Sequence, residues 1–150
     1  MLKLLRKQEK LISTLYSSYG KVFPEHRAFW KTIAAEEKDH AAWLNRLAKK
    51  VKSGEAVFID GRFDPVMIEK SLNFIHTQIE KSHRAGFTIL NALSMALAIE
   101  KGMIESTFFK VVDGDHEDLH ETLEYLSKST KEHARRIEDE WKTQLHAAKK

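Results

Sequence analysis

The sequence contains no cysteine and only two prolines and six glycines among its 150 residues. The absence of cysteine excludes disulfide bonds, thiolate zinc sites, iron–sulfur clusters, covalently attached c-type haem and thiol catalysis, and it is compatible with a reducing cytosol. Proline and glycine interrupt helices, so their scarcity leaves long stretches in which helices can form without a break. The sequence therefore predicts an all-α protein.

Long hydrophobic runs are also missing. No apolar run approaches the roughly 18 residues that a membrane-spanning helix needs. The amino-terminal segment carries a charge every few residues and lacks the apolar centre and cleavage site of a secretion signal. A chain of 150 residues has the length of one domain. We therefore expect a single domain over residues 1–150, located in the cytoplasm, with no membrane partner.

Charge of one sign does not dominate. The chain has 25 basic and 22 acidic residues, which gives a formal charge of +3. The two signs are interspersed in segments such as EEKDH and RRIEDE, and only short lysine pairs look basic. This pattern predicts no nucleic-acid partner.

Apolar residues recur at helical spacings of three and four in five segments of the chain. The expected helices cover residues 2–20, 24–53, 64–86, 88–111 and 116–146. Gly20 is expected to end the first helix. Asp64, followed by Pro65, and Thr88 are expected to cap the starts of the third and fourth helices. Residues 53–63 read as a loop.

Polar residues interrupt four of the five apolar stripes near their centres. A buried carboxylate without a partner is costly, so several that point into one core need a shared cation or a hydrogen-bond network. A metal ion satisfies this need most simply. The interrupting residues are Glu9, Glu37, His40, Glu100, Thr130 and His133.

Glu37 and His40 form a Glu-x-x-His pair, and residues three apart lie on the same side of a helix, where both can bind one ion. The same spacing occurs at Glu80/His83 and at Glu117/His120. Each of these two pairs lies one residue off its apolar stripe, which turns it by about 100° toward solvent. Only Glu37 and His40 are predicted to point inward.

Together these features resemble the ferritin-like superfamily and, within it, the rubrerythrin-type proteins. The resemblance covers most of the chain. It rests on Glu9 with Tyr16 seven residues later, AAEEKDH in the second helix, the long crossover, AIEKGMIESTFF in the fourth helix and STKEHARRIE in the last. It implies a four-helix bundle with an additional helix in the crossover between the second and third bundle helices.

The resemblance also implies a metal site. Such bundles bind two metal ions through one Glu on each of two helices and a Glu-x-x-His on each of the other two. The positions that match in this chain are Glu9, Glu37, His40, Glu100 and His133. The implied cofactor is iron, as one or two ions, and Mn or Zn suits the same ligand types. The implied partners are the metal ions, an electron-donor protein and a second copy of the chain.

Two positions depart from the family pattern. Thr130 stands three residues before His133, where the family has Glu, and Met103 stands three residues after Glu100, where typical rubrerythrins have a second Glu. Two divalent ions carry four positive charges, and three carboxylates would balance only three of them. The absence of cysteine also removes the rubredoxin-type iron centre that supplies electrons in full-length rubrerythrins.

For other residues near the apolar stripes, the sequence allows two alternative roles. Tyr16 either bonds a metal-binding carboxylate or is an ordinary core tyrosine whose hydroxyl is satisfied. Glu36, Glu105 and Glu132 lie beside inward positions and are either replacement ligands or solvated side chains.

Three functions remain open from the sequence. The first is a di-iron oxidoreductase that acts with dioxygen or peroxide. The second is a metal-binding or interaction module that has lost turnover, with Thr130 as the mark of that loss. The third is a metal-free helical scaffold in which the inward Glu and His residues form hydrogen-bonded pairs.

Overall fold

The computed structural model describes residues 1–58, 64–105 and 117–150. These residues form five α-helices and one short 3₁₀ helix, and the described part of the chain contains no strand. The all-α prediction is confirmed. The expected continuation of the fourth helix from 106 to 111 and the expected start of the last helix at 116 lie outside the described residues. The elements are α1 (Leu2–Val22), η1 (Pro24–His26), α2 (Arg27–Ser53), α3 (Pro65–Ser82), α4 (Ile89–Glu105) and α5 (Glu117–Ala148).

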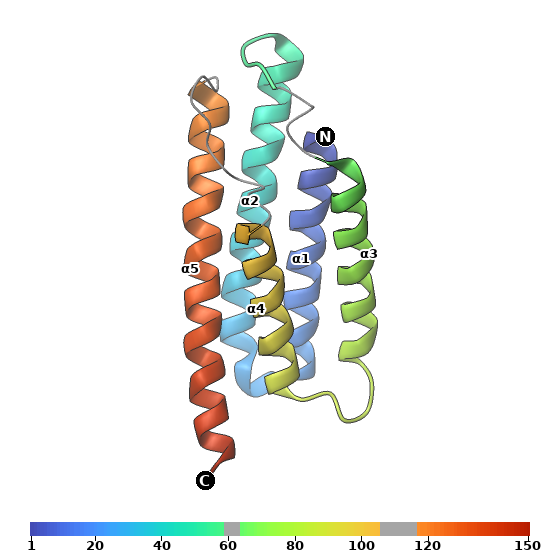
Figure 1. Ribbon diagram of the computed structural model, residues 1–150, viewed down its shortest axis with the longest axis vertical. Coiled ribbons are helices and arrows are strands. Elements are labelled where there is room, and N and C mark those ends of the chain that lie inside the picture. Colours follow the sequence, from blue (N-terminus) through green and yellow to red (C-terminus); the bar gives the residue numbers. More distant parts are fainter. Residues whose placement is uncertain (59–63, 106–116) are drawn as a thin grey trace.

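The α-helices lie side by side along the long axis of the molecule (Figure 1). Helix α1 packs on α2 and on α3, α4 packs on α5, and α2 also contacts α5. Helix α3 therefore lies on the outer side of α1 (Figure 1). None of the helices in the described ranges is both long and apolar enough to cross a membrane.

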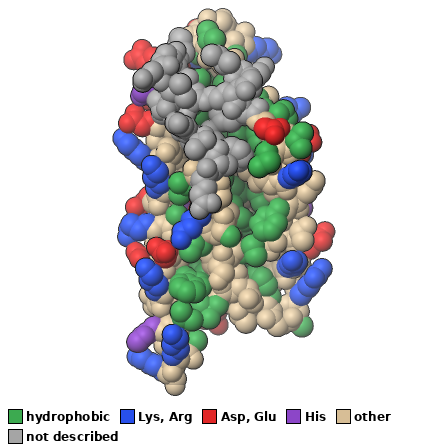
Figure 2. Space-filling model, in the orientation of Figure 1, with side chains coloured by type: hydrophobic (Ala, Val, Ile, Leu, Met, Phe, Trp, Pro, Cys, Tyr) green, Lys and Arg blue, Asp and Glu red, His purple; other side chains and the backbone are tan. Residues whose placement is uncertain are grey.

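One apolar cluster runs through the centre and receives side chains from all five α-helices. The α3 helix contributes Ile68, Leu72 and Ile75, which are buried, and Ile79, which is half-buried. This confirms that α3 packs through the apolar stripe predicted from its sequence. Figure 2 shows further apolar side chains gathered over α4 and the adjacent side of α3, with charged side chains on the flanks.

The predicted helix starts at Asp64 and Thr88 are confirmed. The Asp64 carboxylate accepts a hydrogen bond from the Val66 amide at 2.9 Å, and the Thr88 hydroxyl accepts one from the Asn91 amide at 3.2 Å. Helix α2 ends as predicted at Gly54, whose φ of 82° lies in the left-handed region that glycine adopts without strain.

Three predicted boundaries are wrong. The second helix does not begin at residue 24, because Pro24–His26 form the 3₁₀ helix η1 and α2 begins at Arg27. Gly20 does not end α1, which continues to Val22; Gly20 is buried within the helix, and a Cβ there would make an ordinary contact with Trp30 Cβ at 3.4 Å. Helix α3 ends at Ser82 rather than near Gly86. The Ser82 hydroxyl donates a hydrogen bond to the Ile79 carbonyl at 2.6 Å. It thereby satisfies one of the carbonyl groups that the last turn of a helix leaves without an amide donor.

Candidate metal centre

All five predicted ligands are fully buried, with no exposed surface, and they come from four different helices. Glu9 lies on α1, Glu37 and His40 lie on α2, Glu100 lies on α4 and His133 lies on α5. The inward register predicted from the sequence is therefore confirmed. Both outlying Glu-x-x-His pairs are exposed, as predicted: Glu80, His83, Glu117 and His120.

Glu37 lies at the centre of the group. Its Oε1 atom lies 2.7 Å from His133 Nδ1, and its Oε2 atom lies 3.0 Å from His40 Nδ1. One ligand atom from each of these three residues falls within 4.8 Å of the others. Glu37, His40 and His133 are thus close enough to share one metal ion.

Glu9 and Glu100 flank this central group on opposite histidines. Glu9 Oε2 lies 3.3 Å from His40 Nδ1, and Glu100 Oε1 lies 3.8 Å from His133 Nδ1. Neither belongs to the close set of three. The Nδ1 atom of each histidine therefore faces Glu37 and one further carboxylate.

The outer nitrogen of each histidine has a partner of its own. His40 Nε2 lies 2.6 Å from the Ser129 hydroxyl, and His133 Nε2 lies 2.8 Å from Glu36 Oε2, which also contacts Arg136. A partner on one ring nitrogen fixes the ring orientation and directs the other nitrogen toward a ligand. The half-buried Glu36 side chain thus contacts His133 directly and is not fully solvated, and its role as a replacement ligand stays a prediction. Ser129 was not singled out, because it lies off the apolar stripe of α5.

Tyr16 is connected directly to this group. Its hydroxyl donates a hydrogen bond to Glu100 Oε1 at 2.5 Å, and the side chain is fully buried. Burial, with the negative charge of Glu100 adding to it, raises the pKa of Tyr16 well above its usual value. Tyr16 therefore stays protonated and holds one oxygen of Glu100 in place.

Several polar atoms around the group have no hydrogen-bond partner within the described part of the chain. They include Glu9 Oε1, Glu100 Oε2 and Thr130 Oγ1, and all are buried. Buried polar atoms are nearly always satisfied by a donor, a water or an ion, so such atoms need an explanation. Carboxylate oxygens that lack a donor are suited to a cation.

The two positions that depart from the family pattern are both buried. Thr130 and Met103 have exposures of 1% and 3%. Glu132, considered above as a replacement ligand, is exposed and accepts a hydrogen bond from Arg135 at 2.6 Å. The side chain of Glu105 lies outside the described residues.

The flanking carboxyl groups keep their protons to a higher pH than ordinary carboxyl groups when no metal is bound. Burial, together with the charge of Glu37, raises the pKa of Glu9 to about 8 and that of Glu100 to about 7. Burial alone would also raise the pKa of Glu37. The adjoining rings of His133 and His40 outweigh this effect and hold the pKa of Glu37 well below its usual range.

The two histidines behave in the opposite way. Burial alone would lower their pKa values, but the adjacent carboxylates outweigh it. Glu37 and Glu9 raise the pKa of His40 to about 11, and Glu100 and Glu37 raise that of His133 to about 10. Protons on these rings thus provide the positive charge that a bound cation would otherwise supply.

The donor set fits a metal ion, since two imidazoles and three carboxylates are ligands that Fe, Mn and Zn accept.

Comparisons of the chain with protein families, curated proteins and solved structures found no match. The resemblance noted above therefore rests on this chain's own residues.

Proposed function

We propose that this protein binds one or two transition-metal ions, with iron as the expected metal, through Glu9, Glu37, His40, Glu100 and His133. The bundle is proposed to be ferritin-like, with α1, α2, α4 and α5 as its four helices and α3 in the crossover. One observation carries the proposal. Glu9 and Glu100 each keep a buried oxygen without a donor in the described residues, beside two histidines whose Nδ1 atoms face the same group.

The contacts suggest two adjoining positions for metal. One is bounded by His40, Glu9 and Glu37 Oε2, and the other by His133, Glu100 and Glu37 Oε1. Glu37 belongs to both, so it would help to hold an ion at either position. Because only three carboxylates face up to four positive charges, we expect the first ion to bind more tightly than the second.

An iron ion with an open coordination position would supply activation of dioxygen or peroxide, which is the chemistry of a di-iron oxidoreductase. The protein's own residues would bind the ion, exclude water and hold the ligands still. Ser129 and Glu36 orient the two imidazoles, and the Tyr16 hydroxyl orients Glu100. Met103 and Thr130 leave one side of the site without a fourth carboxylate.

The second candidate function is a metal-binding module without turnover. It is favoured by Thr130 and Met103, which put a hydroxyl and a thioether where the family pattern has carboxylates. Oxidation of bound Fe(II) by dioxygen or peroxide over repeated cycles would support the oxidoreductase. Binding of metal without turnover would support the module.

Anaerobic titration with Fe(II) tests metal binding itself. We expect the native chain to bind Fe(II) and the Glu37→Gln variant, which keeps the side-chain size but removes the shared charge, to lose most of the affinity. The Glu132→Gln variant is the matched control, because Glu132 is exposed on α5. Equal Fe(II) affinities in all three proteins would overturn the proposal.

A further inference from the structure

Positive charge is concentrated on the outer face of α1. This helix carries the basic residues Lys3, Arg6, Lys7, Lys10 and Lys21, and its one carboxylate, Glu9, is buried. The whole chain has 25 basic and 22 acidic residues, so the rest of the chain has a slight excess of acid. Helix α1 is thus a locally basic segment of a chain whose remaining charges are nearly balanced.

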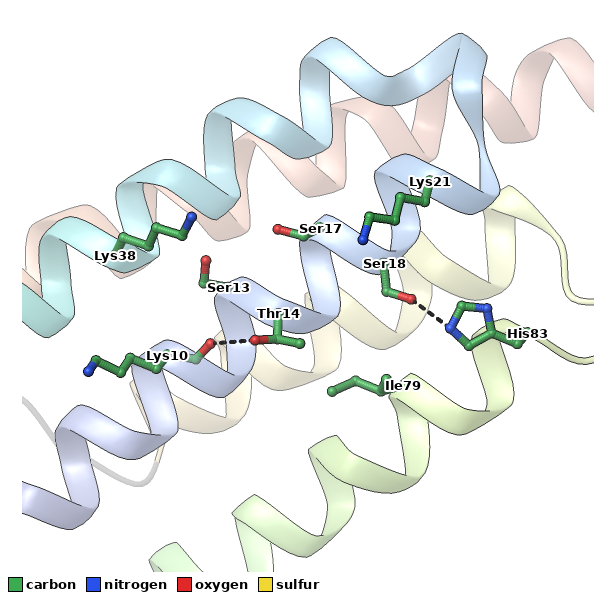
Figure 3. A pocket seen from close by; sticks show the side chains of 9 residues that line it. All are labelled: Lys10, Ser13, Thr14, Ser17, Ser18, Lys21, Lys38, Ile79 and His83. Carbon is green, nitrogen blue, oxygen red and sulfur yellow. Dashed lines mark hydrogen bonds between the residues drawn. The ribbon is translucent and has the colours of Figure 1, made fainter.

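A pocket of about 550 Å³ opens on this face, between α2 and α3 (Figure 3). Nine residues line it and none is acidic. Four carry basic or imidazole groups and four carry hydroxyls. They are Lys10, Lys21, Lys38, His83, Ser13, Thr14, Ser17 and Ser18, with Ile79 as the apolar member.

The side chains of the pocket come from three elements. Lys38 on α2 and Lys21 on α1 lie on either side of Ser17, while Lys10 extends toward the other end of α1 (Figure 3). His83, which follows α3, lies with its Nε2 atom 3.2 Å from the Ser18 hydroxyl. The Ser17 hydroxyl forms no hydrogen bond with any described residue.

Only some lysines of the described residues have a carboxylate partner, and the pocket lysines are not among them. Lys50, Lys101, Lys128 and Lys142 each form an ion pair with a carboxylate. Within the described ranges, Lys10, Lys21 and Lys38 form none. Their positive charge is therefore available to an anion that enters the pocket.

A second hollow of about 440 Å³ adjoins the first and shares Ser17, Lys21 and Lys38 with it. It adds Arg27 and Lys31, and again none of its lining residues is acidic. The shared residues join two basic hollows, so a ligand with anionic groups at both ends can reach both.

We propose that the two hollows form a binding site for a small ligand that carries two or more phosphate groups. Lysine ammonium and guanidinium groups bind phosphate oxygens through charge-assisted hydrogen bonds, and hydroxyl groups add neutral donors. Each hollow has the size of a small-molecule site, which is roughly 300 to 1,000 Å³. The site faces solvent and the candidate metal ligands face the core, so this inference is independent of the proposed function.

The test uses inorganic triphosphate as the probe, in calorimetric titrations of the full chain at about 0.1 M salt, where weak non-specific attraction is screened. We expect one triphosphate to bind per chain. The double variant Lys21→Gln/Lys38→Gln removes both shared cations and should weaken binding by about tenfold or more. The double variant Lys128→Gln/Lys142→Gln makes the same change in net charge on α5 and should leave binding within about twofold.

Several results would overturn the proposal. The native chain could fail to bind triphosphate, or both double variants could lose affinity equally. Binding of a short single-stranded oligonucleotide without binding of triphosphate would also overturn it, because that result would indicate a nucleic-acid surface. Circular dichroism of each variant, matched to the native spectrum, ensures that a loss of binding is not a loss of fold.

Discussion

The rings of His40 and His133 lie nearly parallel, with centroids 5.1 Å apart and 17° between their planes. The Nδ1 atom of each ring faces Glu37. With pKa values of about 11 and about 10, both rings carry a proton at neutral pH in the metal-free protein and repel each other. Metal ions bound at Nδ1 would replace these protons and keep the positive charge between the rings and the carboxylates.

The first prediction is that metal binding releases protons. At pH 7 the pKa values of His40, His133 and Glu9 lie above the pH, so each holds a proton that a metal must displace, and we expect release of about three protons when both proposed positions are filled. Calorimetry of Fe(II) or Zn(II) binding in two buffers of different ionisation enthalpy measures this number. A binding enthalpy that does not depend on the buffer would contradict it.

The second prediction concerns the stability of the metal-free protein. The pKa values of His40 and His133 in the folded state lie above the ordinary value of 6.5, at about 11 and about 10. The folded state therefore binds more protons than the unfolded state above about pH 6.5, and the free energy of unfolding should fall as the pH rises through that window. The contribution is fully present below pH 6.5. The lowered pKa of Glu37 acts only in acid, below its unfolded value.

Urea denaturation in the presence of a chelator, at pH 7 and at pH 9.5, measures this slope. The double variant His40→Gln/His133→Gln removes both titrating rings and should show a flatter dependence on pH. A native protein whose free energy of unfolding stays constant between the two pH values would contradict the assignment of protons to the rings.

The inward register of Glu9, Glu37 and His133 could be predicted because an amphipathic helix shows its buried face in the spacing of its apolar residues. That spacing says which residues point inward, but it does not say which atoms meet. The contacts of Ser129 with His40 and of Glu36 with His133 depend on how α2 and α5 are rotated against each other. The sequence of a single helix does not contain that rotation.

Other features could not be predicted from the sequence because they also depend on how the helices pack against one another. The residue type of Gly20 predicts a helix end, but α1 continues past it to Val22, and Gly20 lies buried beside Trp30. Lys21 and Lys38 lie on different helices and are separated by residues of both charges in the sequence. Only the packing of α1 on α2 brings them to one pocket.

The third prediction concerns Thr130, which is buried and whose hydroxyl has no partner among the described residues. A fourth carboxylate at this position would balance the charge of a second divalent ion. Thr130→Glu should therefore strengthen the second step of an anaerobic Fe(II) titration. Thr130→Gln has the same size without the charge and serves as the control. If the Glu variant binds the second ion no better than the Gln variant, Thr130 does not occupy a lost ligand position.

The fourth prediction concerns the attachment of α3. Ile75 has no exposed surface, whereas its neighbour Phe74 is 45% exposed. Ile75→Ala should lower the free energy of unfolding by about 2 to 5 kcal/mol, because it leaves a cavity in the core. Phe74→Ala should change it by only about 0.5 kcal/mol. Equal effects of the two substitutions in urea denaturation would show that α3 does not pack through the predicted stripe.

The central claim is that the buried Glu and His residues hold metal. The most direct measurement is elemental analysis of the protein purified without added metal or chelator, expressed as ions per chain and compared with the Glu37→Gln variant. The account predicts between one and two transition-metal ions per native chain, with iron foremost, and a marked loss in the variant. A native protein that contains no transition metal and takes up none on anaerobic reconstitution would contradict it, and the inward residues would then be a metal-free hydrogen-bonded network.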